Sequence, residues 1–119
     1  MASVTGFGGA FLRADDPAAL AAWYAEHLGL PRSHGVFELA QTAERAPVVL
    51  AFFPRDEASF PATQPVMLNL QVDDVDGLLD RLAAVGVAVD PERRSFDGIG
   101  RFGWFTDLEG NRVELWQPS

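Results

Sequence analysis

The pattern of apolar and polar residues occurs twice along this chain, in two copies about 58 residues apart. The first copy is Leu-Arg-Ala-Asp-Asp at 12–16, and the second is Leu-Gln-Val-Asp-Asp at 70–74. Each copy reads as a short strand and an aspartate pair, followed by an apolar helical stretch and a glycine. A repeat of half the chain length predicts two similar modules packed together, with a symmetric surface between them where a ligand could bind.

The first helical stretch follows Asp15 and Asp16. Either aspartate can accept the free backbone N–H groups of a helix start, and Pro17 suits the first helical position. Gly29 is the expected left-handed stop. The residues of its apolar face recur at helical spacing: Leu20, Trp23, Tyr24, His27 and Leu28. The pattern predicts a helix that ends at Leu28.

The second helical stretch has the same design. Asp73 or Asp74 is the expected cap, Asp76 lies in the first turn, where acids suit the helix dipole, and Gly86 ends the helix. Its apolar face consists of Val75, Leu78, Leu79, Leu82 and Val85.

Short apolar runs around the helices predict strands. These runs are 9–14, around 36–39, 48–53, 67–72, a segment starting at 87, 102–106 and 112–116. The three turn formers in 95–101 predict a loop, and the proline-containing stretch 54–65 predicts a linker. Each module is therefore a strand, a helix and about three strands. We expect one α+β domain, with module 1 at about 6–56 and module 2 at about 65–119.

The composition and net charge of the chain exclude some classes of ligand and of site. The net charge of −8 argues against nucleic acid and mildly favours cationic or neutral ligands. The absence of cysteine removes disulfides and thiolate metal sites. No apolar run approaches the length of a membrane span, and the N-terminus lacks the pattern of a signal peptide, so a cytoplasmic protein is expected.

Three segments carry a resemblance to a known family. They are 12–17 leading to 28–30, 72–75 leading to Gly86, and Asp-Leu-Glu-Gly-Asn-Arg-Val-Glu-Leu-Trp at 107–116. The chain resembles the vicinal oxygen chelate superfamily, which includes glyoxalases, ring-cleaving dioxygenases and bleomycin-resistance proteins. The resemblance implies paired βαβββ modules whose sheets curl around a cup, and it implies a homodimer.

The resemblance also implies where a metal would bind. Metal-dependent members hold a divalent ion on four side chains, which polarises the substrate as a Lewis acid. Those positions correspond here to Gly9, Leu50, Met67 and Glu114, and only Glu114 is a suitable ligand. One carboxylate is too few for a catalytic divalent ion, so we expect no metal cofactor.

Alternation along the strands predicts which side chains line the cup. Those in phase with Gly9 and Met67 are Phe11, Arg13, Leu50, Phe52, Met67, Asn69, Gln71, Glu114 and Trp116. Trp104 joins them if the hairpin register places it there. The opposite set is entirely apolar: Ala10, Leu12, Leu68, Leu70, Val72, Val113 and Leu115. An aromatic concavity with sparse polar groups is typical of a small-molecule site.

This cup favours a metal-independent protein that binds and sequesters a small organic ligand, cationic or aromatic. Glu114 could pair with a ligand cation or serve as a general base, and it is the only catalytic candidate. It could instead pair with Arg112, Arg101 or Arg13, and the aromatics could fill a sheet or dimer interface.

Two other classes of function stay open at this point. One is a lyase, isomerase or dioxygenase of the same superfamily. The other is an accessory domain that binds a protein partner through an exposed apolar patch.

Overall fold

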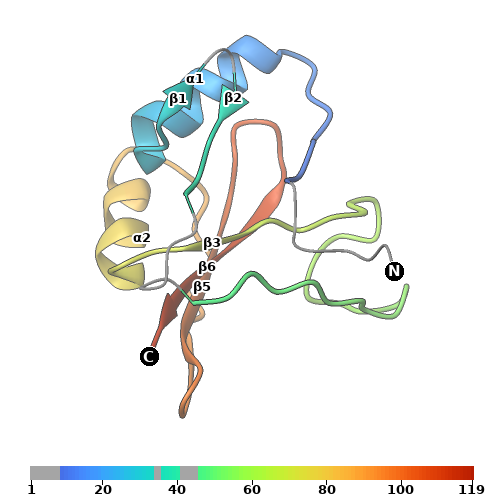
Figure 1. Ribbon diagram of the computed structural model, residues 1–119, viewed down its shortest axis with the longest axis vertical. Coiled ribbons are helices and arrows are strands. Elements are labelled where there is room, and N and C mark those ends of the chain that lie inside the picture. Colours follow the sequence, from blue (N-terminus) through green and yellow to red (C-terminus); the bar gives the residue numbers. More distant parts are fainter. Residues whose placement is uncertain (1–8, 34–35, 41–45) are drawn as a thin grey trace, which may run out of the picture.

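The computed structural model describes residues 9–33, 36–40 and 46–119. In this part of the chain two helices accompany a four-stranded sheet and a separate two-stranded ribbon (Figure 1). The α+β class expected from the sequence is confirmed. Neither helix in the described ranges is long and apolar enough to cross a membrane.

Helix α1 spans Pro17–Leu28, as predicted. The Asp16 carboxylate accepts the backbone N–H of Ala19 at 3.1 Å, and Pro17 is the first helical residue. Gly29 ends the helix with φ of +67°, a conformation that a residue with a Cβ adopts only at a cost.

Helix α2 spans Val75–Ala84 and is capped in the same way. The Asp74 carboxylate accepts the backbone N–H of Gly77 at 3.0 Å. Gly86, which follows the helix end, has φ of +89°. Of the two caps proposed for each helix, the structure uses the second aspartate, because its carboxylate reaches the N–H three residues ahead.

The main sheet has the order β3–β6–β5–β4. Its strands are β3 Asn69–Gln71, β4 Arg94–Phe96, β5 Gly100–Thr106 and β6 Arg112–Pro118. The pairing of β3 with β6 is parallel, and the β5–β6 and β4–β5 pairings are antiparallel. The second module thus has the predicted order of a strand, a helix and three strands.

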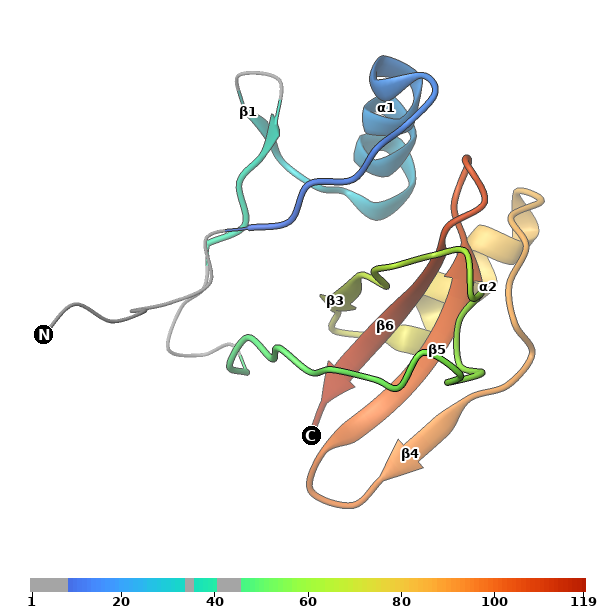
Figure 2. The ribbon, with the colours of Figure 1, turned by 90° about the vertical axis from the view of Figure 1, so that its right-hand side faces the viewer.

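The core lies between α2 and one face of this sheet (Figure 2). Its fully buried side chains are Val75, Leu79, Leu82, Phe105, Val113 and Leu115. Gly103 lies at the centre of the contact, where an added Cβ would collide with Leu79 and come within 3.1 Å of Val75. The absence of a side chain there lets helix and sheet approach closely.

The strand predictions for module 1 need correction. The described residues of this half contain α1 and a ribbon of β1 Arg32–Ser33 and β2 Val36–Phe37. The predicted strands 9–14 and 48–53 are not formed. A strand requires a neighbour that takes up its backbone hydrogen bonds, and the described part of this single copy places no such neighbour beside either segment.

Three smaller predictions in module 2 also change. The segment 95–101, predicted as a loop, contains the end of β4 and the start of β5. Its turn formers make a tight hairpin turn, in which Ile99 donates its N–H to the Phe96 carbonyl at 3.1 Å and Gly98 has φ of +75°. The strand predicted over 67–72 is confined to β3, and the one predicted from 87 reduces to a single bridge between Val89 and Phe105.

Candidate functional site

Two rows of side chains cross the sheet on the face opposite α2. In the first, Glu114 on β6 is the register partner of Asn69 on β3 and of Trp104 on β5. In the second, Trp116 on β6 is the partner of Gln71 and of Phe102. The hairpin register therefore places Trp104 on the same face as Glu114, and the alternation predicted for module 2 holds.

Glu114 is held from both sides by neutral donors. Asn69 donates its side-chain N–H to Oε1 at 2.6 Å, and the indole N–H of Trp104 donates to Oε2 at 3.0 Å. Trp104 is only 8% exposed, so this donor is rigidly placed. The carboxylate has a fixed orientation on a face that is otherwise largely aromatic.

The three arginines considered as partners of Glu114 do not pair with it in the described structure. Arg112 pairs with Asp90 at 2.8 Å, and Arg101 pairs with Asp76 at 2.8 Å. Arg13 is exposed, in the segment before α1. Within the described residues, Glu114 has no cationic side chain within 4.0 Å.

Beside this carboxylate lies an aromatic ladder formed by Phe96, Phe102 and Trp116. The rings of Phe102 and Trp116 are stacked, with centroids 6.0 Å apart and planes within 2° of parallel. Phe96 meets Phe102 edge-on at 5.9 Å, and the indole N–H of Trp116 donates to the Ile99 carbonyl at 3.0 Å. The sequence prediction included Trp116 but missed Phe102 and Phe96, although Phe102 lies two residues before Trp104 in the same alternation.

Arg112 closes one end of the site. Its guanidinium lies 5.4 Å from the centre of the Trp104 ring and donates to Asp90 and, at 2.9 Å, to the Ser59 carbonyl. The Gln64 side-chain amide hydrogen-bonds both the N–H and the carbonyl of the Arg112 backbone, at 2.9 and 2.7 Å. The predicted linker is thus anchored at this end of the site. The pKa of Asp90 is lowered, mainly because its carboxylate accepts a hydrogen bond from the Glu92 backbone N–H. The hydrogen bond from Arg112 is the second contribution.

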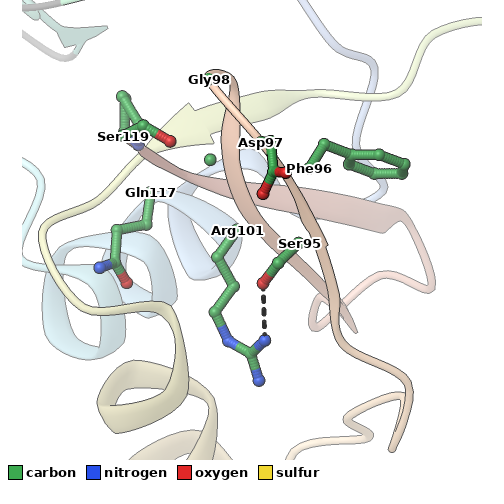
Figure 3. Close-up of a pocket in the computed structure, with 9 residues that line it drawn as sticks. Ser95, Phe96, Asp97, Gly98, Arg101, Gln117 and Ser119 are labelled. Carbon is green, nitrogen blue, oxygen red and sulfur yellow. Dashed lines mark hydrogen bonds between the residues drawn. The ribbon is translucent and has the colours of Figure 1, made fainter.

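The β4–β5 hairpin also borders a separate cavity of about 280 Å³ (Figure 3), whose side chains Arg101 and Gln117 contact α2 and so lie on the opposite face of the sheet. Ser95, Asp97, Arg101 and Gln117 are among its lining residues. Arg101 donates to Ser95 Oγ at 2.9 Å, and its charge is balanced by Asp76. This cavity contains none of the predicted site residues, and its one cationic side chain is already paired.

The predicted site residues of module 1 do not join the Glu114 row. Phe11 is 99% exposed, Leu50 is 68% exposed, Phe52 is 87% exposed and Arg13 is also exposed. The physical reason is that segments 9–14 and 48–53 form no strands, so nothing orients these side chains over the sheet. From module 2, Met67 is half-buried just before β3, and Gln71 donates to the Ala46 carbonyl at 2.9 Å.

Within the described residues, the groups around Glu114 do not fit a divalent metal ion. The described residues contain no group of three or more His, Cys, Asp or Glu side chains that could hold one. The groups that touch Glu114, an amide N–H and an indole N–H, are hydrogen-bond donors, whereas a cation requires lone pairs.

Comparison with solved structures shows the fold. The chain is similar to TnmS3, an antibiotic binding protein from Streptomyces sp. CB03234, with 27% identity, a TM-score of 0.53 and 88% of each chain covered. It is also similar to the fosfomycin resistance protein FosX from Listeria monocytogenes, solved with Mn(II) and a sulfate ion. That likeness has 19% identity and a TM-score of 0.61, over 98% of this chain and 93% of FosX.

TioX from Micromonospora sp. ML1 has 19% identity and a TM-score of 0.52, over 87% of this chain and 91% of TioX. The two likenesses at 19% identity show the shared fold alone. No match was found among curated protein sequences.

The family itself follows from a sequence model. The model described as "Glyoxalase/Bleomycin resistance protein/Dioxygenase superfamily" matches residues 6–115, which is nearly the whole chain. This match spans both helices, β5, the first part of β6 and the Glu114 position, and it agrees with the resemblance noted in the sequence. The chain therefore belongs to the glyoxalase/bleomycin resistance protein/dioxygenase superfamily.

Proposed function

We propose that this protein binds a small organic molecule on the β5–β6 face and sequesters it without a metal ion. The observation that carries the proposal is the juxtaposition of a fixed, unpaired carboxylate, Glu114, with the stacked rings of Phe102 and Trp116. Aromatic surface with a few fixed polar groups is what orients a small ligand in a protein site. An acidic group in such a setting favours a ligand that is cationic or aromatic, or both.

The similarity to TnmS3 supports this class of function. That protein is described as an antibiotic binding protein, and the likeness extends over most of both chains. Binding alone requires no acid–base group or metal, which suits a site whose single carboxylate is engaged by two hydrogen-bond donors. The likeness to an antibiotic binding protein lends no such support to a role for Glu114 as a general base.

We also propose that two copies of the chain associate. The run 48–53 is wholly apolar, and Val48, Val49, Leu50, Phe52 and Phe53 are each at least half exposed. An exposed apolar segment whose backbone has no strand partner can pair with the same segment of a second chain. Because the run carries no charge, two copies of this acidic chain can meet along it without burying one.

Tryptophan fluorescence tests the binding function. Aromatic amines and neutral aromatics are titrated into protein kept in excess EDTA, and the emission is followed to saturation. Saturable quenching that is unchanged by EDTA supports metal-independent binding. Quenching that appears only after a divalent ion is added back contradicts it.

A further inference from the structure

The aromatic ladder is rigid before any ligand arrives. The hydrogen bond to the Ile99 carbonyl fixes the plane of the Trp116 indole, and Phe102 lies parallel to it. Gly100 makes this possible, because a Cβ there would collide with the Gln117 carbonyl and lie 2.8 Å from the Trp116 indole nitrogen. A planar group that packs on these rings therefore pays little for ordering them.

Glu114 keeps unused hydrogen-bonding capacity and an unbalanced charge. A carboxylate can accept about four hydrogen bonds, and Glu114 accepts one at each oxygen within the described structure. Both donors are neutral, so they orient the group without cancelling its charge. A cationic N–H donor on a ligand would form the strongest type of hydrogen bond available to it.

The two features have a set spacing and direction. Glu114 and Trp116 lie two residues apart on β6 and on the same face, which corresponds to roughly 7 Å in an extended strand. Arg112 covers the Trp104 ring on the other side of Glu114 and is held there by Asp90. The Arg112–Asp90 ion pair occupies that end of the face, so the apolar part of a ligand bound at Glu114 extends toward the stacked rings of Phe102 and Trp116.

We infer that the ligand class is a planar aromatic cation, with its ring system on the Phe102–Trp116 stack and an ammonium or amidinium N–H on Glu114. The inference deepens the proposed function and rests on it. Asn69 and Trp104 act as positioning residues, since their hydrogen bonds fix the Glu114 carboxylate. They keep it at a distance from the Phe102 and Trp116 rings that a single substituent on the ligand's ring system can span. A flat neutral molecule can pack only on the aromatic ladder, and an aliphatic amine can hydrogen-bond only to the Glu114 carboxylate.

Three probes of similar size separate these contributions: 2-naphthylmethylammonium, 2-naphthylmethanol and the saturated decahydro-2-naphthylmethylammonium. Their dissociation constants are measured by isothermal titration calorimetry in EDTA. We expect the naphthyl cation to bind at least about tenfold more tightly than either of the other probes, because the alcohol lacks the charge-assisted hydrogen bond and the aliphatic cation lacks the aromatic ring system.

Two site variants and one control assign the effect. Glu114→Gln should abolish the preference for the naphthyl cation over the alcohol while leaving binding of the alcohol within about twofold. Trp116→Leu should weaken both naphthyl probes by a similar factor. Asp80→Asn, which removes the same charge from the exposed side of α2 on the opposite face of the sheet, should leave the preference intact.

The outcomes distinguish this inference from the proposed function. Equal affinity of the native protein for the naphthyl cation and the alcohol, or a preference that survives Glu114→Gln, overturns the inference but leaves small-molecule binding in place. If neither naphthyl probe binds the native protein, both the inference and the proposed function are overturned. Circular dichroism and the indole N–H signal of Trp23, which packs against Phe105 and does not contact Glu114, confirm that each variant is folded.

Discussion

The phenol O–H of Tyr24 on α1 donates to the buried carboxylate of Asp107 in the β5–β6 turn, at 2.8 Å across 83 positions of sequence. Asp107 is 5% exposed and also accepts backbone N–H groups from Glu109 and Asn111. Burial and the neighbouring carboxylate both raise the pKa of Tyr24 far above its ordinary value, so the phenol remains a donor. This contact ties the first helix to the turn that ends at the candidate site.

Tyr24→Phe tests how much this contact contributes. Loss of a buried hydrogen bond to a charged acceptor should lower the free energy of unfolding by about 1.5–3 kcal/mol. The measurement is urea denaturation followed by circular dichroism. Ser95→Ala is a useful control because it removes a hydroxyl whose hydrogen bond, from Arg101 at 2.9 Å, is exposed. A Tyr24→Phe change of less than about 0.5 kcal/mol would contradict the role assigned to the pair.

A second carboxylate of the same turn holds the start of α1. Glu109 accepts the backbone N–H of Asp15 at 2.7 Å and that of Asp16 at 2.9 Å. Glu109→Ala should leave both amides without this acceptor, so their hydrogen exchange should become at least about tenfold faster. The N–H of Gly77, which donates to the Asp74 carboxylate in the equivalent cap of α2, is the internal reference. Unchanged exchange at 15 and 16 would show that the contact is not maintained in solution.

The contact of α2 with the sheet depends on the missing side chain at Gly103. Gly103→Ala would push a methyl group into Leu79 and Val75, which are fully buried. We expect a loss of about 1–3 kcal/mol in the free energy of unfolding, as overpacking of a core requires. Gly103 is not among the glycines with positive φ, so this substitution reports packing and not backbone strain. A Gly103→Ala protein as stable as the native one would mean that the helix is less closely packed than described.

Acid should weaken one surface cluster in a predictable direction. The Arg101 hydrogen bond, with a further contribution from Arg93, lowers the pKa of Asp76. A carboxylate with a depressed folded-state pKa stabilises the fold above its unfolded pKa of about 3.9 and loses this contribution as pH falls through the folded value. Because Asp76 is 45% exposed, the contribution is at most about 1 kcal/mol. The stability gap between native protein and Asp76→Asn should therefore narrow between pH 7 and pH 3, measured by urea denaturation; an equal gap at both pH values contradicts this.

Association through the run 48–53 makes a separate prediction. Phe52→Asp places a charge in that run and should convert a dimer into a monomer in sedimentation velocity. Val85→Asp adds the same charge to another exposed apolar residue, at the end of α2, and should leave association unchanged. A native protein that sediments as a monomer at all concentrations contradicts the proposed homodimer.

The helices and the sheet face of module 2 were predictable because they depend on local rules. Caps and glycine stops determine α1 and α2, and period-two alternation places Glu114 and Trp116 on one face. Strand β4 was not predicted because a glycine-rich hairpin turn follows it, and such a turn has the same composition as a loop. The segments 9–14 and 48–53 could not be predicted from composition, because an apolar run becomes a strand only beside a partner.

The candidate site was predictable in its residue types more than in its contacts. Alternation identified Asn69, Trp104 and Glu114, but the hydrogen bonds that orient the carboxylate depend on the exact cross-strand register. The same register makes Phe102 the stacking partner of Trp116. The residue pattern of one strand alone does not show which side chains of the next strand lie opposite it.

The indole N–H signals of the three tryptophans in a ¹H–¹⁵N correlation spectrum test the central claim most directly. With 2-naphthylmethylammonium titrated into protein in EDTA, the account predicts saturable shifts of Trp104 and Trp116. Trp23, which packs against His27 and Phe105, should not move. Shifts confined to Trp23, or shifts that require an added divalent ion, would contradict a metal-independent site on the β5–β6 face.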